Sequence, residues 1–309
     1  MRSKTQDGSH YLWWPTRSVG YYIQEDCALR PPPNPLPDAV ADAGEAEVTY
    51  LGLCHAAVER SFQSWQNVGD VAAGGPGCTD LQLPYLDDTA KREVGYDPDA
   101  GSANTNLVLF QPVLCDAVVP PGDPCWADQS CDGPYGCFSH GAEVIALTTT
   151  TYQPADGTLV DADIEVNDAP AGAGGFDFSA EVGNPIPGTT DVQNTLTHEI
   201  GHFIGLDHNC GFTGAPVCTP TLEAGVMFKD AAPGEIVKRT LKEDDENAIC
   251  HVYPTGVSSQ IVNLQDSSGQ TTVEVVSGPA CSSGGGLAPV WLGLILALAL
   301  RRAGKLRAR

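Results

Sequence analysis

Apolar residues recur along the chain with two different periods, and these periods predict its main helices and strands. Residues 19–23 and 107–110 are short apolar runs typical of buried strands. Residues 142–152 and 158–166 are two β-rich runs around Asp156-Gly157, a turn dipeptide, which predicts a hairpin or tight turn. Residues 45–65 predict one long amphipathic helix, because the following apolar positions fall at helical spacing: Val48, Leu51, Val58, Phe62 and Trp65.

A second helix is predicted after residue 190. Thr190 and Gln193 fit the capping-box pattern, with Thr190 as the N-cap. Gly205 supplies a residue that tolerates the left-handed turn at which a helix ends. The order of strand, helix, strands and helix predicts an α+β fold class, with loops over residues 31–37 and 168–187. The apolar stripe of this second helix is formed by Val192, Leu196, Ile200 and Phe203.

The opposite side of this helix has a residue pattern typical of zinc sites. Residues 198–208 read H-E-x-x-H-x-x-G-x-x-H, and His198 and His202 lie about one helical turn apart. The turn at Gly205 brings His208 back towards them, so three imidazoles bind one ion and the fourth tetrahedral position stays open for water. Glu199 is placed to take a proton from that water, whose pKa zinc lowers to about 7. The pattern predicts a catalytic Zn²⁺ site that hydrolyses peptide bonds.

The residues alone leave other interpretations open. The segment can be an ordinary buried helix, although the fixed offsets of Gly205 and His208 argue against coincidence. The domain can be a catalytically idle surface adhesin or binding module, but a structural zinc needs no carboxylate such as Glu199 beside its ligands. A third alternative is hydrolysis of a non-peptide bond, which zinc chemistry permits.

The extended motif resembles that of the metzincin metallopeptidases, and within them the matrixin branch. Met227 is the one methionine besides Met1, and it lies where that family has a methionine-containing turn below the zinc. Residues 161–166 resemble the strand before the active-site helix, and residues 241–254 resemble the C-terminal helix. The resemblance implies a twisted mixed sheet, a long backing helix, an active-site helix, a Met-turn and a C-terminal helix. It also implies a zinc-dependent endopeptidase that acts on proteins or peptides.

The chain departs from the matrixin pattern in two places. It has no P-R-C-G-x-P-D-like prosegment, so a cysteine-switch zymogen is not supported. It also lacks the His-rich loop of a second zinc site; only His140 lies in that region, and it is not assigned as a ligand. Metzincins bind substrate along the edge strand of the sheet. Our candidate for that strand is residues 175–181, and the segment between His208 and Met227 is expected to form the pocket wall.

Acidic residues in the run 158–166 are candidates for binding a second metal. Side chains alternate along a strand, so Asp161, Asp163 and Glu165 share one face. Carboxylate oxygens are ligands that Ca²⁺ prefers. The loop geometry that calcium requires is not readable from the sequence, so a strand without calcium stays the favoured interpretation.

Charge and cysteine content point to an oxidising compartment and away from nucleic acid. The 39 acidic and 16 basic residues give a net charge of −23, so no nucleic-acid partner is expected. Eleven cysteines are many for a reducing cytosol. Ten lie in the body of the chain and allow up to five disulfides of open connectivity. The close sets that predict stapled loops are Cys125/Cys131/Cys137 and Cys210/Cys218.

Composition divides the chain into four parts. We assign residues 1–12 to an N-terminal segment, 13–254 to the matrixin-like domain, 255–280 to a Ser-, Gly-, Val- and Thr-rich stalk, and 281–309 to a tail. Residues 1–30 hold no apolar run typical of a signal peptide, so we expect that a leader is missing. In the tail, Cys281 is followed by a glycine-rich patch, an apolar run over 287–300 and a basic cluster.

This tail resembles the C-terminal sorting tails of myxobacterial surface proteins. The resemblance implies an exported protein, at the cell surface or outer membrane or released, that is processed or lipid-modified at Cys281. It implies export and sorting machinery as partners and membrane contact through the tail before processing. The alternative is a plain membrane anchor, although a helix over 287–300 spans only about 20 Å of a roughly 30 Å hydrocarbon core.

Overall fold

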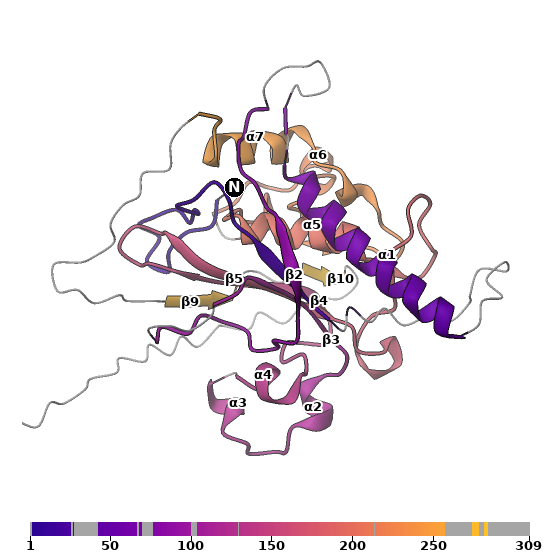
Figure 1. The fold of residues 1–309 in the computed structure, drawn as a ribbon. Coiled ribbons are helices and arrows are strands. Elements are labelled where there is room, and N and C mark those ends of the chain that lie inside the picture. The colour runs from indigo at the N-terminus through magenta and orange to yellow at the C-terminus, as the bar shows by residue number, and fades with distance from the viewer. Residues whose placement is uncertain are drawn as a thin grey trace, which may run out of the picture.

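The centre of the protein is an eight-stranded sheet, in which five consecutive strands are mostly parallel (Figure 1). The computed structural model describes residues 2–25, 27, 43–66, 68–69, 77–99, 104–128, 130–212, 214–256, 274–277 and 281–283. β1, β2, β3 and β5 run parallel, and β4 runs antiparallel to β5. The mixed α+β class predicted from the sequence is confirmed. In spatial order the five strands are β2 (Tyr85–Thr89), β1 (Tyr21–Gln24), β3 (Leu107–Gln111), β5 (Leu159–Asn167) and β4 (Val144–Tyr152).

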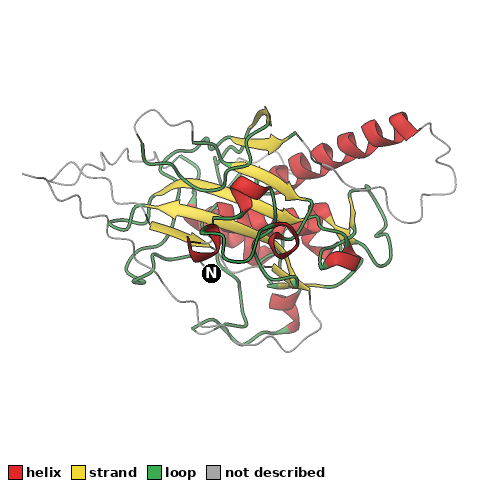
Figure 2. Cartoon of the chain, turned by 90° about the horizontal axis from the view of Figure 1, so that it is seen from below, coloured by secondary structure: helices red, strands yellow, loops and turns green. Residues whose placement is uncertain are grey.

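Two helices pack on the same side of this sheet (Figures 1 and 2). α1 (Ala43–Ser64) matches the helix predicted over residues 45–65, and α5 (Val192–Phe203) follows the predicted second helix. Phe62 of α1 stacks on Tyr21 of β1 with ring centroids 3.5 Å apart, and it contacts Phe203 of α5 edge-on at 5.6 Å. The apolar stripe of α5 is fully buried, as predicted. These aromatic contacts fix α5 against both α1 and the sheet.

α5 begins one residue later than predicted, because its N-cap is Asp191. The Asp191 carboxylate accepts a hydrogen bond from the backbone N–H of Asn194 at 2.7 Å. Thr190 instead belongs to the two-residue strand β7 (Thr190–Asp191), which pairs with β6 (Phe178–Ser179). Gln193 does not complete a capping box either, because its side-chain oxygen accepts from Arg60 at 3.0 Å.

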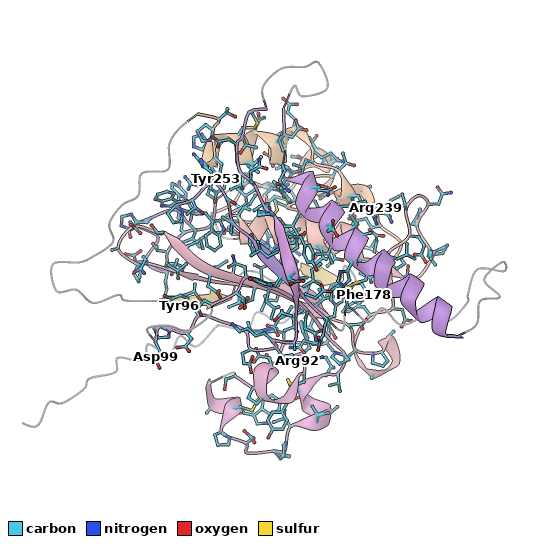
Figure 3. All side chains as sticks on the ribbon, in the orientation of Figure 1. Arg92, Tyr96, Asp99, Phe178, Arg239 and Tyr253 are labelled. Atoms are coloured by element: carbon cyan, nitrogen blue, oxygen red, sulfur yellow. A yellow bond between two sulfur atoms is a disulfide. The ribbon has the colours of Figure 1, made fainter. Side chains whose placement is uncertain are left out.

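Asp191 also forms an ion pair with Arg239, whose position beside α1 is visible in Figure 3. The guanidinium donates to both carboxylate oxygens, from Nε to Oδ1 at 2.8 Å and from Nη2 to Oδ2. It further donates to the carbonyls of Glu181 and Gly183. One buried carboxylate therefore caps α5 and fixes the loop that precedes it.

The candidate edge strand over residues 175–181 is wrong. Its strand β6 pairs only with β7, in a separate two-stranded sheet. In the main sheet β4 lies at one end of these five strands, next to β5. Its outer edge pairs with two strands from near the end of the chain, β9 (Glu274–Ser277) and β10 (Cys281–Ser283), and β10 also pairs with β8 (Asp230–Ala231).

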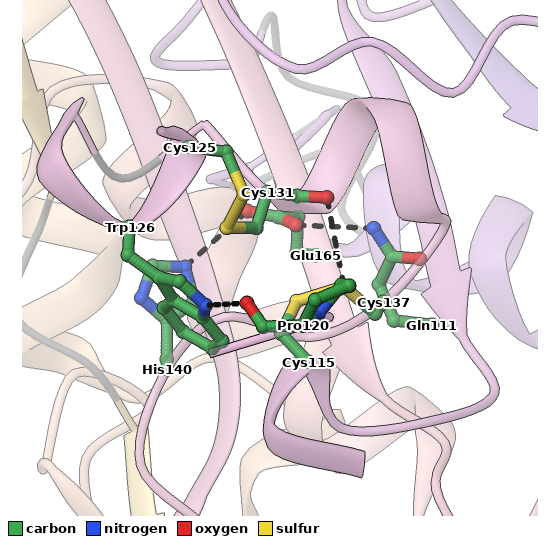
Figure 4. The surroundings of a disulfide bond; sticks show 9 residues. All are labelled: Gln111, Cys115, Pro120, Cys125, Trp126, Cys131, Cys137, His140 and Glu165. Carbon is green, nitrogen blue, oxygen red and sulfur yellow. Dashed lines mark hydrogen bonds and ion pairs between the residues drawn. A yellow bond between two sulfur atoms is a disulfide. The ribbon is translucent and has the colours of Figure 1, made fainter. Parts of the chain in front are cut away.

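Five disulfides use all ten cysteines of the body, as the count predicted. The pairs Cys115–Cys137 and Cys125–Cys131 close a small unit below the sheet (Figure 4). That unit contains α2 (Cys115–Val118), α3 (Cys125–Asp128) and α4 (Asp132–Tyr135). Such a number of disulfides is typical of an extracellular or otherwise oxidising environment. The other three pairs are Cys27–Cys54, Cys78–Cys250 and Cys210–Cys218.

The remaining elements surround the end of α5. Residues 2–12 lie against it, where Ser3 donates its backbone N–H to the Gly205 carbonyl at 2.9 Å. α7 matches the helix expected over residues 241–254. No described helix is long and apolar enough to cross a membrane, and residues 287–300 lie outside the described part. The short elements and α7 are η2 (Ala171–Ala173), α6 (Pro220–Glu223), η3 (Val237–Arg239) and α7 (Glu243–Val252).

We expect Asp191→Ala to lower the free energy of unfolding by about 3 kcal/mol. The change removes an N-cap, worth about 1 kcal/mol, and leaves the half-buried Arg239 without its carboxylate. Urea unfolding of the oxidised protein measures the loss. Asp244→Ala is the matched control, because Asp244 is exposed in the first turn of α7; its effect is expected below about 1 kcal/mol. Equal losses in the two variants would contradict the assigned role.

Candidate metal centre

Three histidines converge at the end of α5. His198 and His202 lie on the helix one turn apart, and His208 follows the turn that ends it. One nitrogen from each ring lies within 4.8 Å of the others, and the ring centroids are 4.9 to 5.2 Å apart. Among the described residues this is the one group of His, Cys, Asp and Glu side chains that could hold a metal ion. The structure thus brings together the ligands that the sequence predicted.

Backbone carbonyls set the orientation of two of the rings. The Nδ1 atom of His198 lies 2.7 Å from the Val226 carbonyl, and Nδ1 of His202 lies 2.8 Å from the Leu206 carbonyl. A carbonyl can only accept, so each Nδ1 carries the proton and each Nε2 carries the lone pair. Metal-binding histidines are commonly oriented in this way.

The Nε2 atoms point into a shared space. Nε2 of His198 and Nε2 of His208 lie 3.3 Å apart. Nε2 of His202 is buried and has no hydrogen-bond partner in the described part of the chain. Buried polar atoms are rarely left unsatisfied, and converging lone pairs repel unless a cation lies between them. The donor set therefore fits a divalent ion bound by three imidazole nitrogens.

Burial keeps these imidazoles in the neutral form that binds metals. All three side chains are at most 3% exposed. Burial lowers the pKa of His202 to about 4 and that of His208 to about 2, and it lowers the pKa of His198 well below its usual value. The neighbouring imidazoles and the positive charge of Lys238 lower the pKa of His198 and His208 further. Protons therefore do not compete with a metal for these nitrogens near neutral pH.

Glu199 is fully buried on α5, and its carboxylate faces β4. The Thr148 hydroxyl on β4 lies 2.7 Å from Oε2 of Glu199 and 3.0 Å from its backbone carbonyl. This contact fixes the plane of the carboxylate relative to the sheet. Sequence reasoning missed Thr148, because a run of threonines on a strand does not indicate which one faces the helix.

The turn after α5 can be made only by glycine. Gly205 has a φ of +87°, and a Cβ atom at this position would lie 2.6 Å from the Leu12 carbonyl oxygen. The turn brings the Leu206 carbonyl within hydrogen-bonding distance of Nδ1 of His202, and His208 follows two residues later. The sequence prediction for Gly205 is confirmed, and the approach of Leu12 adds a second reason for it.

Met227 packs directly beneath the histidine-bearing helix. It is 2% exposed, and a Cβ atom on Gly201 would lie 2.1 Å from its sulfur. Asn209 donates its backbone N–H to the Met227 carbonyl at 3.1 Å. The predicted packing role of Met227 fits this position, and Gly201 is the helix position that makes room for it.

Asp245 of α7 fixes the backbone of this turn. Its buried carboxylate accepts from the N–H groups of Val226 at 3.0 Å and Met227 at 3.4 Å. Burial raises the pKa of Asp245, and the backbone donors lower it. Because the Val226 carbonyl bonds His198, Asp245 indirectly positions a metal ligand. In the sequence, Asp245 was noted only as part of the segment that resembles a matrixin C-terminal helix. Its hydrogen-bond partner Val226 lies 19 residues away along the chain, so no local pattern indicated this role.

The acidic residues of β5 are not among the groups that could share a metal. Asp163 accepts backbone N–H groups of Gly95 at 2.6 Å and Leu107 at 2.9 Å. Burial raises the pKa of Asp163 well above its usual value and that of Asp161 to about 6. The candidate calcium ligands thus share one buried face of the strand, and none of them belongs to a group of described residues that could hold a metal. They are Asp161, Asp163 and Glu165.

Glu165 extends instead towards the disulfide-bonded unit (Figure 4). Its carboxylate accepts from Gln111 at 3.3 Å and lies 3.4 Å from Nε2 of His140. His140 is thus a partner of a buried carboxylate, which agrees with its not being assigned as a ligand. Cys281, the expected processing residue, lies in β10 and is not part of the five disulfides.

No protein-family model matches the chain, and no match is found among curated proteins. The interpretation of the site therefore depends on its own geometry.

We expect Gly201→Ala to destabilise the protein by about 2 kcal/mol, although alanine favours a helix. The new methyl group displaces the Met227 sulfur within a closed core, and overpacking of this kind costs about 1–3 kcal/mol. Gly52→Ala on α1 is the matched control, because its Cβ meets nothing within 4 Å. It should stabilise the protein by up to about 1 kcal/mol. Chemical unfolding of both variants tests this, and a Gly201→Ala protein at least as stable as the parent would refute the close packing.

Proposed function

We propose that the protein is a zinc-dependent endopeptidase. His198, His202 and His208 bind the metal, and Glu199 is the general base. The observation that supports this most directly is the convergence of three neutral imidazoles, with the buried Glu199 carboxylate on the same helix as two of them. Three protein ligands with an adjacent acid are typical of a catalytic zinc site, whereas structural sites use four protein ligands.

The chain's own residues supply the proton transfers. Zinc, when bound, provides Lewis-acid activation of water and of the scissile carbonyl. Glu199 accepts the proton of the attacking water and then donates it to the leaving amine. Thr148 fixes Oε2 and so restricts rotation of the carboxylate during both transfers. Exclusion of solvent around the imidazoles strengthens these electrostatic interactions.

Several features support a metzincin-like, matrixin-like assignment within this proposal. They are the extended motif, the glycine turn before His208, and Met227 packed under the helix. β4 replaces residues 175–181 as the strand that binds substrate by β-augmentation, because its side away from β5 pairs only with β9 and β10 among the described strands and because it contacts Glu199 through Thr148.

The proposal places the enzyme outside the cytosol. Its five disulfides fit an oxidising environment. The tail resemblance adds a cell-surface, outer-membrane or released location, with export and sorting machinery and protein or peptide substrates as partners. A catalytically idle binding module is the weaker candidate. Burial of the Glu199 carboxylate destabilises the fold, and a module that only binds has no need for a carboxylate at this position.

We expect Glu199→Ala to keep its metal and to lose about 10²- to 10⁴-fold of its peptide turnover. His202→Ala should lose the metal as well, because it removes a ligand. Elemental analysis measures bound zinc, and hydrolysis of an unstructured protein such as casein measures turnover. Glu246→Ala, an exposed position on α7, serves as the control and should retain both. Undiminished hydrolysis by Glu199→Ala would rule out the assigned base.

We also expect a chelator to lower the midpoint of thermal unfolding, and added zinc to restore it. A ligand that binds only the folded state stabilises by about 2.7 kcal/mol at a hundredfold excess over its Kd. Differential scanning calorimetry of the parent and of His202→Ala tests this. A midpoint that shifts equally in both proteins would show that zinc acts somewhere other than the histidine cluster.

A further inference from the structure

The outer edge of β4 is occupied by a segment of the same chain. β9 pairs antiparallel with it from Tyr152 to Thr149, and β10 pairs antiparallel with it from Ala146 to Val144. The two stretches follow one another in the chain, and residues 274–277 and 281–283 pair with opposite halves of β4. The three residues that join them, 278–280, lie outside the described part.

Thr148, which contacts the Glu199 carboxylate, lies between the two paired stretches of β4. β10 also comes within 8 Å of α5, measured between Cα atoms. The segment therefore passes the part of the sheet from which Glu199 is positioned.

β10 is paired on both of its sides. Ser282 faces Val144 of β4 in an antiparallel arrangement and Asp230 of β8 in a parallel one. β4 and β8 thus form a slot that takes one extended chain and satisfies its backbone on both edges. A strand added in this way gains affinity from main-chain hydrogen bonds whatever its sequence.

We propose that β9 and β10 together act as an autoinhibitory segment that occupies the substrate position along β4. This inference rests on the proposed peptidase function of the same site. An extended substrate needs the same backbone donors and acceptors of β4 that the segment already uses. Because the segment is tethered, its effective concentration is of millimolar order, so even weak pairing keeps the slot filled. The near-complete burial of the three histidines agrees with a closed site.

The test uses the full chain with three proline substitutions, Val275→Pro, Val276→Pro and Ser282→Pro. Proline has no N–H to donate to a neighbouring strand. Adjacent positions of an antiparallel strand alternate in bonding, so two neighbouring prolines in β9 remove at least one bond to β4. β10 is paired on both sides, so each of its backbone N–H groups points towards β4 or β8, and a proline at position 282 removes one of these donors. The matched control is Val275→Thr, Val276→Thr and Ser282→Thr, which keeps every N–H and a strand-forming residue.

Two measurements separate the segment's role from the peptidase chemistry. Amide hydrogen exchange of residues 144–152, followed by mass spectrometry, reports whether the β4 edge is covered. Steady-state hydrolysis of a peptide substrate reports KM and kcat. The proline variant should exchange faster in this strand and show an apparent KM lowered by about tenfold with kcat unchanged, as expected for loss of a tethered competitor. The threonine control should match the parent in both.

Unchanged exchange and unchanged KM in the proline variant would overturn the proposal. Faster exchange with an unchanged KM would also overturn it, because the segment would then cover the edge without competing with substrate. Faster exchange in a protein that cleaves no peptide in any variant would uphold occupation of the edge and would reject the peptidase function instead.

Discussion

Two hydrogen bonds between imidazole Nδ1 atoms and backbone carbonyls determine the geometry of the metal centre. They fix the tautomer of His198 and His202, and they aim both Nε2 lone pairs at His208. Each accepting carbonyl belongs to a turn, and each turn is stabilised by a different part of the chain. Asp245 of α7 fixes the turn at Val226, and Ser3 near the N-terminus contacts the turn at Gly205. The centre therefore forms only when distant segments have packed.

The core supports the same arrangement from the opposite side. Trp65, the residue after α1, donates its indole N–H to the Thr197 carbonyl at 2.8 Å, and Trp14 donates to the Phe203 carbonyl at 2.7 Å. The Tyr253 hydroxyl donates to the Ile204 carbonyl at 2.9 Å (its position is labelled in Figure 3). Carbonyls at the C-terminal end of a helix lack helical partners, so Trp14 and Tyr253 satisfy groups that would otherwise be buried and unpaired, and Trp65 adds a second donor to a carbonyl within the helix. α5 is thus held by hydrogen bonds as well as by its apolar stripe.

Local patterns predicted much of this fold, and long-range contacts account for what they missed. Helical spacing was enough to place the three histidines and to anticipate the burial of Phe203. The N-cap was misplaced, because pairing of Thr190 with β6 depends on a loop that has no pattern of its own. Thr148 and Asp245 act across the fold, and a single sequence does not reveal which threonine or aspartate does so. The pairing of β9 and β10 with β4 was equally hidden, since a Ser-, Gly-, Val- and Thr-rich composition indicates a linker.

The disulfide between Cys78 and Cys250 joins α7 to a segment 172 residues earlier in the chain. α7 is short, with ten residues, and half of its surface faces solvent, so its ends are expected to fray. The covalent link limits how far the frayed helix can move. Asp245 then stays close to the backbone groups that it bonds, and transient opening of this corner remains local and quickly reversed. A cross-link distant from the three histidines in sequence thus protects their geometry against thermal fluctuation.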